Sequence, residues 1–208
     1  MAFFPDKTFE DIGDYIDAYA ALVQTALQSV DKRELARATE RLEQAVLSGA
    51  RIFVCGNGGS AAIANHFCCD HMKGISSDTG IMPNVLSLST NIELITAIAN
   101  DMSYDRIFAF QLSRQAERGD VLFVISSSGN SPNIVAAMEW AKENGVTVIA
   151  MSGFSGGAAK RGADISLHVA VDNYGVVEDA HQCLMHILAQ YLRHKHLTAP
   201  EKLGAIKF

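Results

Sequence analysis

The fold class follows from one stretch, VLFVISSSGNSPNIVAA, at residues 121–137. Aliphatic and aromatic residues at 121–125 predict a short buried strand, and Pro132 stands where proline commonly begins a helix. Between them lies the hydroxyl-rich loop 126–131, whose last residue, Ser131, is a good helix N-cap. A strand followed by a polar loop and a helix is the repeating unit of an α/β fold.

The same unit recurs on both sides of this stretch. Short apolar runs bounded by Gly, Pro, Asp or Ser alternate with amphipathic helical patterns. The runs are 51–55, 84–88, 121–125, 146–151 and 165–171, and the helical patterns between them are 61–73, 92–100, 104–117 and 133–144. This alternation predicts a three-layer α/β sandwich around a central parallel five-stranded sheet that is buried on both faces.

Further helical patterns lie outside the sheet region. Apolar residues recur near the helical period in 12–27 and 31–47, and a last helix is expected over 177–194. We therefore expect a single domain over 1–208, with N-terminal helices at 1–50, an α/β core at 51–197 and a tail at 198–208. The tail is expected to be loose or to contact a neighbouring molecule.

Composition excludes several classes of function. The formal net charge is −6 and lysines and arginines do not cluster, which argues against nucleic-acid binding. The N-terminus lacks the pattern of a signal peptide, and no apolar run reaches membrane-spanning length. The four cysteines form no C-x-x-C pair. We expect a cytoplasmic protein with reduced thiols and no membrane partner.

Two of the predicted strands end in loops suited to an anion. GNGGS at 56–60 and SSSGNS at 126–131 each lead into a helix, whose first N–H groups are unpaired and whose dipole is positive at that end. In open parallel sheets, ligands bind at the carboxyl ends of the strands. A plain turn explains one such loop, but two in one sheet favour a phosphate site. Neither loop is a dinucleotide or ATP motif.

These motifs resemble the SIS (sugar isomerase) family and, within it, the phosphoheptose isomerases. The resemblance rests on CGNGGSAAIANHF (55–67), TAIANDMSYDRIF (96–108), GDVLFVISSSGNSPNIVAA (119–137) and the HIL segment of the last helix. SSSGNS marks the superfamily, and GNGGS with a histidine six residues after its serine marks the branch. The resemblance implies an aldose–ketose isomerase acting on sedoheptulose 7-phosphate in heptose or lipopolysaccharide biosynthesis. It also implies a homotetramer with active sites between subunits.

The resemblance assigns roles to residues on the two loops and on two helices. The substrate phosphate would be held by Ser60, Ser126, Ser127, Ser128 and Ser131, and the rest of the substrate by Asn57, Gly58, Gly59, Asp101 and Glu178. One zinc ion (Zn2+) would bind His66, Asp70, Glu178 and His186. Asp70 and His186 would be the catalytic acid and base.

The chain departs from the family pattern at two of these positions. The family usually has Glu where this chain has Asp70, whose carboxylate sits about 1 to 1.5 Å further back because Asp is one methylene shorter. The family usually has Gln where this chain has Glu178, and the added negative charge suits a divalent metal.

Helical spacing constrains the proposed metal ligands. His66 and Asp70, at i and i+4, share one helix face, either as ligands or as a local pair. Glu178 and His186 are about 12 Å apart along a straight helix, too far to share one metal. Either Glu178 precedes the helix, or the two come from different subunits. His181 is an alternative inward-facing residue, and His71 is expected at the surface or beside the site.

Two alternative functions remain open at this point. One is a non-catalytic SIS module that binds a sugar phosphate or a replication-initiator protein, as some relatives of the branch do. The other is an isomerase of a different sugar phosphate. The presence of His66, Asp70, Glu178 and His186 together favours catalysis, because a docking surface requires none of them.

Overall fold

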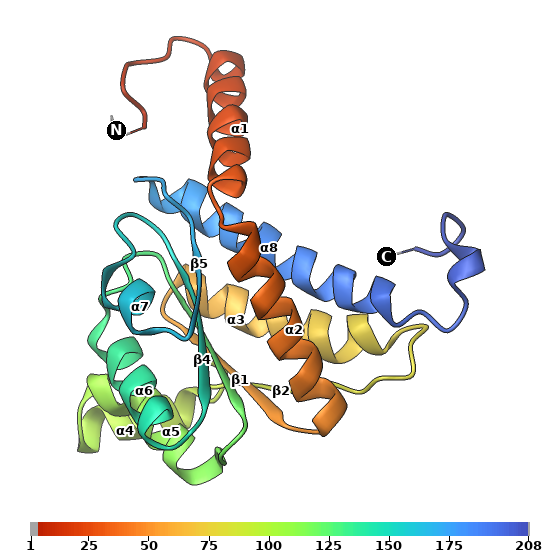
Figure 1. Cartoon of the computed structure of the whole chain (residues 1–208). Coiled ribbons are helices and arrows are strands. Elements are labelled where there is room, and N and C mark those ends of the chain that lie inside the picture. The colour runs from red at the N-terminus through yellow and green to blue at the C-terminus, as the bar shows by residue number, and fades with distance from the viewer. Residues whose placement is uncertain (1–3, 208) are drawn as a thin grey trace.

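The computed structural model describes residues 4–207 and has a parallel sheet at its centre (Figure 1). The strands are β1 (Arg51–Gly56), β2 (Asn84–Ser87), β3 (Val121–Ser126), β4 (Thr147–Ser152) and β5 (Ile165–His168). The helices are α1 (Ile12–Gln28), α2 (Lys32–Ser48), α3 (Gly59–Cys69), α4 (Ile92–Asp101), α5 (Ile107–Gln115), α6 (Pro132–Glu143), α7 (Gly157–Gly162) and α8 (Tyr174–Lys195). Three short turns complete the order: η1 (Asp70–Gly74), η2 (Tyr104–Arg106) and η3 (Pro200–Lys202).

The sheet confirms the predicted architecture. All strand pairs are parallel, and the order is β2-β1-β3-β4-β5. Successive strand residues point to opposite faces. Ile52 and Val54 therefore pack with α1, α2, α3 and α8, whereas Phe53 and Cys55 pack with α4, α5, α6 and α7. Burial on both faces explains why each strand appears in the sequence as a continuous apolar run.

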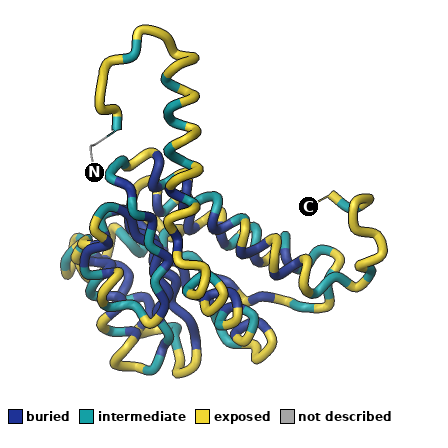
Figure 2. Tube along the Cα trace, turned by 45° about the horizontal axis from the view of Figure 1, so that its top comes forward, coloured by how far each residue is buried: buried dark blue, intermediate teal, exposed yellow. Residues whose placement is uncertain are grey.

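The N-terminal helices begin at the residues that local chemistry favours. The Asp11 carboxylate accepts a hydrogen bond from the Gly13 N–H at 2.6 Å, and Asp31 accepts one from Arg33 at 2.7 Å, as helix N-caps do. Helix α2 packs on the sheet, but α1 projects from the body (Figure 1) and remains largely exposed (Figure 2). Ala26 is its one fully buried residue.

Two details differ from the sequence-based expectations. Helix α7 was not predicted, because it is only six residues long and has glycine at both ends. The tail is not loose where the structure describes it: the Thr198 N–H donates to the Asp78 carbonyl at 2.9 Å, and Arg193 donates to the Lys207 carbonyl at 3.1 Å. Phe208 lies outside the described residues.

Within residues 4–207, no helix is both long enough and apolar enough to cross a bilayer.

A pair of glycine substitutions tests how tightly the second anion loop is built. Gly129 has a φ of +67°, and a Cβ there would collide with the backbone carbonyl of Gly156. Gly49 has a similar φ of +75° but open space around it. We expect Gly129→Ala to lower the free energy of unfolding by about 3 kcal/mol or more and Gly49→Ala by about 1 kcal/mol. Urea denaturation measures both, and equal losses would contradict the packing described.

Candidate active site

The two predicted anion loops meet at the point where the strand order reverses. From β1, the chain pairs with β2 on one side and with β3 on the other. The ends of β1 and β3 are in register, with Gly56 opposite Ile125. The loops that follow these strands are therefore neighbours at the carboxyl edge of the sheet. Ligands bind at this switch point in doubly wound folds.

Reciprocal amide hydrogen bonds hold the two loops together. Asn57 Nδ2 donates to Asn133 Oδ1 at 2.9 Å, and Asn133 Nδ2 donates to Asn57 Oδ1 at 2.8 Å. The Tyr104 hydroxyl also donates to Asn57 Oδ1, at 3.0 Å. Sequence reasoning identified Asn57 but missed Asn133, a buried amide in the first turn of α6. The sequence signal that could have identified Asn133 is its position two residues after the hydroxyl-rich loop 126–131.

A small cavity of about 180 Å³ opens between these loops and the start of α8. Its lining residues are Asn57, Ser60, Ile125, Ser126, Ser127, Ser128, Ser131, Tyr174 and Glu178. Ser127 Oγ is buried and has no hydrogen-bond partner among the described residues. Ser131 occupies the N-cap position of α6, but its side chain makes no capping hydrogen bond. These hydroxyls are thus available to a ligand, as an anion at a helix N-terminus requires.

Glu178 belongs to α8, and its side chain reaches the N-terminal end of α3. Its carboxylate fills the space beside Gly59, where any Cβ would collide with it. A negative charge is favourable at the N-terminal end of a helix. Glu178 therefore borders the serine cavity and supplies a negative charge beside the residues that would hold an anion.

A second group of polar side chains lies further along α3 and α8. His66 Nε2 is 3.3 Å from Asp70 Oδ1, and His186 Nε2 is 3.5 Å from Asp70 Oδ2. The two imidazole rings meet edge to face with centroids 5.0 Å apart. Gln182 contacts both rings, although it was not predicted from the sequence. Asp70 thus reaches both histidines despite its short side chain.

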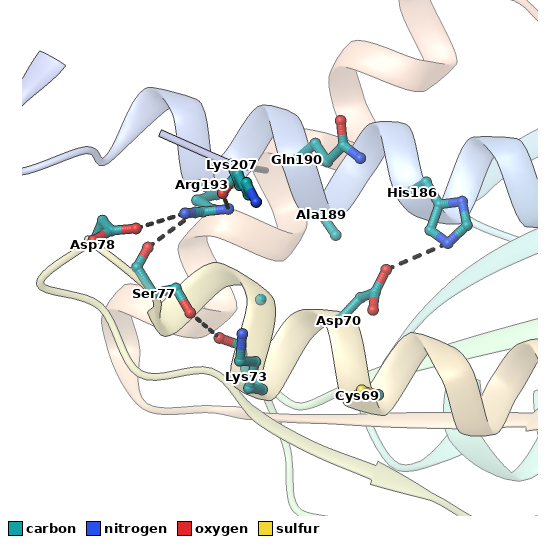
Figure 3. A pocket seen from close by; sticks show the side chains of 11 residues that line it. Cys69, Asp70, Lys73, Ser77, Asp78, His186, Ala189, Gln190, Arg193 and Lys207 are labelled. Carbon is teal, nitrogen blue, oxygen red and sulfur yellow. Dashed lines mark hydrogen bonds and ion pairs between the residues drawn. The ribbon is translucent and has the colours of Figure 1, made fainter. Parts of the chain in front are cut away.

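The packing of α3 against α8 assembles this cluster. The two helices run in the same direction, since Gly59 lies near Glu178, His66 near Gln182 and Asp70 near His186. At Asp70 the helix widens into the π-turn η1, where the Ile75 N–H donates to the Asp70 carbonyl. Single π-turns inside helices are frequent at functional sites. Figure 3 shows Asp70 and His186 facing each other across the gap between the helices.

The structure also places two predicted residues outside this cluster. Glu178 lies within α8, so the possibility that it precedes the helix is wrong. Within one chain it is about 12 Å along the helix from His186. Asp101 is exposed at the end of α4, where Asn100 Nδ2 donates to its carboxylate at 2.8 Å. It does not line the serine cavity.

Two histidines close to the site belong to the core. His71 was expected at the surface or beside the site, and the surface alternative is wrong: it is fully buried and stacks on Phe67 with ring centroids 3.6 Å apart. The π-turn rotates His71 inward, and burial lowers its pKa to about 3. His181 is also fully buried, and burial lowers its pKa to about 4. Both are therefore neutral near pH 7, and neither joins the cluster of His66, Asp70 and His186.

A larger cavity of about 850 Å³ begins at Asp70 and His186 and continues between η1 and α8 (Figure 3). Lys73 lines it from one side and Arg193 from the other, where Arg193 Nη2 is 2.6 Å from the Asp78 carboxylate. The cluster of His66, Asp70 and His186 is thus open to the surface on the side away from the serine cavity.

The donor set of the cluster suits a divalent metal. His66, Asp70 and His186 each offer one ligand atom, and these atoms all lie within 4.8 Å of one another. Two imidazole nitrogens and a carboxylate oxygen match the ligands that zinc takes in catalytic sites.

Comparison with known proteins agrees with the fold. The SIS domain family matches residues 14–153. A phosphoheptose isomerase of Mycobacterium tuberculosis is 40% identical over 170 residues, which cover 81% of this chain and 86% of that protein. One from Shewanella denitrificans is 35% identical over 83% of this chain and 90% of its own.

Solved structures give the same result. The phosphoheptose isomerase of Neisseria gonorrhoeae superposes with a TM-score of 0.79 at 30% identity, covering 88% of this chain and 98% of that one. That of Francisella tularensis gives 0.79 at 28% identity. The fold and site define a sugar-isomerase-type domain. The chain belongs to the SIS domain family, in its phosphoheptose isomerase branch, and is an isomerase.

Two substitutions in the serine cavity should change phosphate binding in opposite directions. Ser128→Ala removes a hydroxyl and should weaken binding of inorganic phosphate about tenfold, the effect of one hydrogen bond to a charged group. Glu178→Gln removes a like charge and should strengthen binding severalfold. Calorimetric titration measures both, with the exposed Ser113→Ala on α5 as the control. Unchanged affinity in both cavity variants would contradict this assignment.

Proposed function

We propose that this protein interconverts sedoheptulose 7-phosphate and an aldoheptose 7-phosphate. The observation that carries the proposal is that α3 and α8 join a phosphate-type cavity at one end to an acid–base cluster further along. Ser60 at the cavity and His66 at the cluster are six residues apart on α3, or about 9 Å. An extended sugar phosphate with several carbons between its phosphate and its carbonyl fits such a spacing. The relatives named phosphoheptose isomerase support the choice of a heptose.

The reaction requires a proton to move between two adjacent carbons. In the proposed mechanism, the Asp70 carboxylate accepts a proton from C1 of the ketose, which leaves an enediol, and then returns it to C2. His186 donates a proton to the C2 oxygen and accepts one from the C1 hydroxyl, so protons balance over the cycle. Such positioned acids and bases commonly contribute about 10²–10⁴-fold each to a rate. Asp70 Oδ2 and His186 Nε2, 3.5 Å apart, can flank the same pair of carbons.

We also propose that His66, Asp70 and His186 hold a divalent metal, zinc. A zinc ion held by these residues would polarise the substrate carbonyl in place of the proton from His186, because a ring nitrogen that binds a metal carries no proton. The residues themselves set the geometry: His66 Nε2 lies 3.3 Å from Asp70, which keeps the carboxylate oriented between the two rings. Glu178 of a neighbouring subunit remains the fourth ligand that the sequence suggested.

A turnover assay on sedoheptulose 7-phosphate tests this function. We expect Asp70→Asn and His186→Ala each to lower kcat by about 10²–10⁴-fold, because each loses a proton-transfer group. His186→Ala should do so with or without added zinc. The exposed His194→Ala, at the end of α8, should retain full activity. A wild-type protein that binds the sugar phosphate without converting it would contradict the proposal.

We further propose that the protein forms a homotetramer in the cytoplasm. Helix α1 exposes Ile12 and Ile16, which are 80% and 62% accessible in one chain, and α8 exposes Ile187 and Tyr191. Large apolar side chains gathered on projecting helices favour burial against another copy of the chain.

Sedimentation at micromolar concentration measures the assembly. We expect a tetramer, or at least a dimer, that Ile12→Asp combined with Ile16→Asp dissociates by placing charges in the contact. Lys7→Ala, a surface change outside the helix, serves as the control. A monomer with full activity would exclude the proposed assembly.

A further inference from the structure

Tyr174 is the first residue of α8 and lines the serine cavity. Asn173, directly before it, caps the helix, because its Oδ1 accepts a hydrogen bond from the Val176 N–H at 3.0 Å. The cap fixes the start of α8 beside the cavity. The Tyr174 side chain is 61% exposed, so it stands at the mouth of the cavity and not in its interior. No step of the proposed mechanism uses this residue.

Phe154 supports the ring of Tyr174. The two ring centroids are 4.6 Å apart, and the ring planes are inclined at 58°. Phe154 follows β4 and has a φ of +49°, in the left-handed region that bulky side chains rarely adopt. The Phe154 N–H donates to the Val171 carbonyl at 3.0 Å, which helps to hold this conformation. Strained backbone of this kind is concentrated at sites that bind ligands.

The loop that contains Phe154 is also attached to the serine loop and to α8. The Gly153 N–H donates to the Ser127 carbonyl at 2.8 Å, and a Cβ on Gly153 would collide with the Val177 side chain. Ser127 Oγ, which has no hydrogen-bond partner among the described residues, belongs to the cavity lining. These contacts hold the aromatic pair at the mouth of a cavity that contains an unpartnered buried hydroxyl.

We propose that Tyr174 is a substrate-binding residue of the isomerase. Its hydroxyl donates to the phosphate in the serine cavity, and its ring, held by Phe154, covers the mouth. The inference rests on the proposed function, since it takes this cavity as the phosphate end of the substrate. A phenol hydroxyl is an uncharged donor, and a hydrogen bond to a charged phosphate oxygen is stronger than one between neutral groups. Covering the mouth reduces contact with water, which strengthens such a bond further.

Calorimetric titration of the full chain with inorganic phosphate separates the hydroxyl from the ring. Tyr174→Phe keeps the ring and removes the donor, and we expect it to weaken phosphate binding about tenfold. Phe154→Asn removes the supporting ring while asparagine tolerates the positive φ, and we expect a loss of severalfold. Tyr191→Phe is the matched control, because Tyr191 is a similarly exposed tyrosine near the far end of α8. Its phosphate affinity should equal that of the wild type.

Steady-state kinetics with sedoheptulose 7-phosphate distinguish a substrate contact from a structural role. We expect Tyr174→Phe to raise KM about tenfold and to leave kcat unchanged, because a contact to the phosphate is made equally before and during the chemical step. Distortion of the site would lower kcat as well. Thermal unfolding and sedimentation of each variant should match the wild type.

Several results would overturn the inference. If Ser128→Ala loses phosphate affinity and Tyr174→Phe does not, this inference fails alone and the serine cavity stands. If Tyr174→Phe lowers kcat or changes the sedimentation of the protein, Tyr174 has a structural or subunit contact instead. A wild type that binds no phosphate would refute both this inference and the proposed function. If the variants lose affinity as expected but the wild type does not turn the sugar over, the isomerase proposal fails and the phosphate contact stands.

Discussion

The parallel pairing of β1 with β3 is the constraint on which the site depends. Because Gly56 and Ile125 are in register, the glycine loop and the serine loop leave the sheet side by side. Asn57 and Asn133 then join the loops through paired amide hydrogen bonds. A shift of one residue in this register would turn the strand side chains to the opposite layers and separate the loops. Buried apolar residues on both faces of the sheet oppose such a shift.

The parallel packing of α3 against α8 extends the site from this edge. Both helices begin at the anion cavity and continue together to the histidine cluster, so the distance between the two is set by helical rise. The π-turn at Asp70 adds a local adjustment, since it directs Asp70 toward α8 and buries His71 against Phe67. One end of the site thus offers uncharged hydroxyls and helix N-termini, and the other offers imidazoles and a carboxylate. The separation suits a ligand with an anionic end and a reactive end.

The sequence predicted the features that depend on local pattern. The five strands follow from apolar runs, the serine loop from its hydroxyls before Pro132, and the shared face of His66 and Asp70 from their i, i+4 spacing. It missed what depends on packing between distant segments. Gln182 is an ordinary polar helix residue until α3 brings His66 beside it. The burial of His71 against Phe67 was not predicted, because a π-turn has no clear sequence signal. The 12 Å separation of Glu178 and His186 was predicted from helical spacing, but only the structure shows that Glu178 lies within α8 and does not precede it.

The central claim is that one sugar phosphate spans the serine cavity and the histidine cluster. A crystal structure of the Asp70→Asn variant with sedoheptulose 7-phosphate tests it most directly, because slowed turnover preserves the bound substrate. The account predicts the phosphate among Ser126, Ser127 and Ser128, and C1 and C2 of the sugar beside residue 70 and His186. A phosphate bound elsewhere, or a sugar directed away from His186, would contradict it.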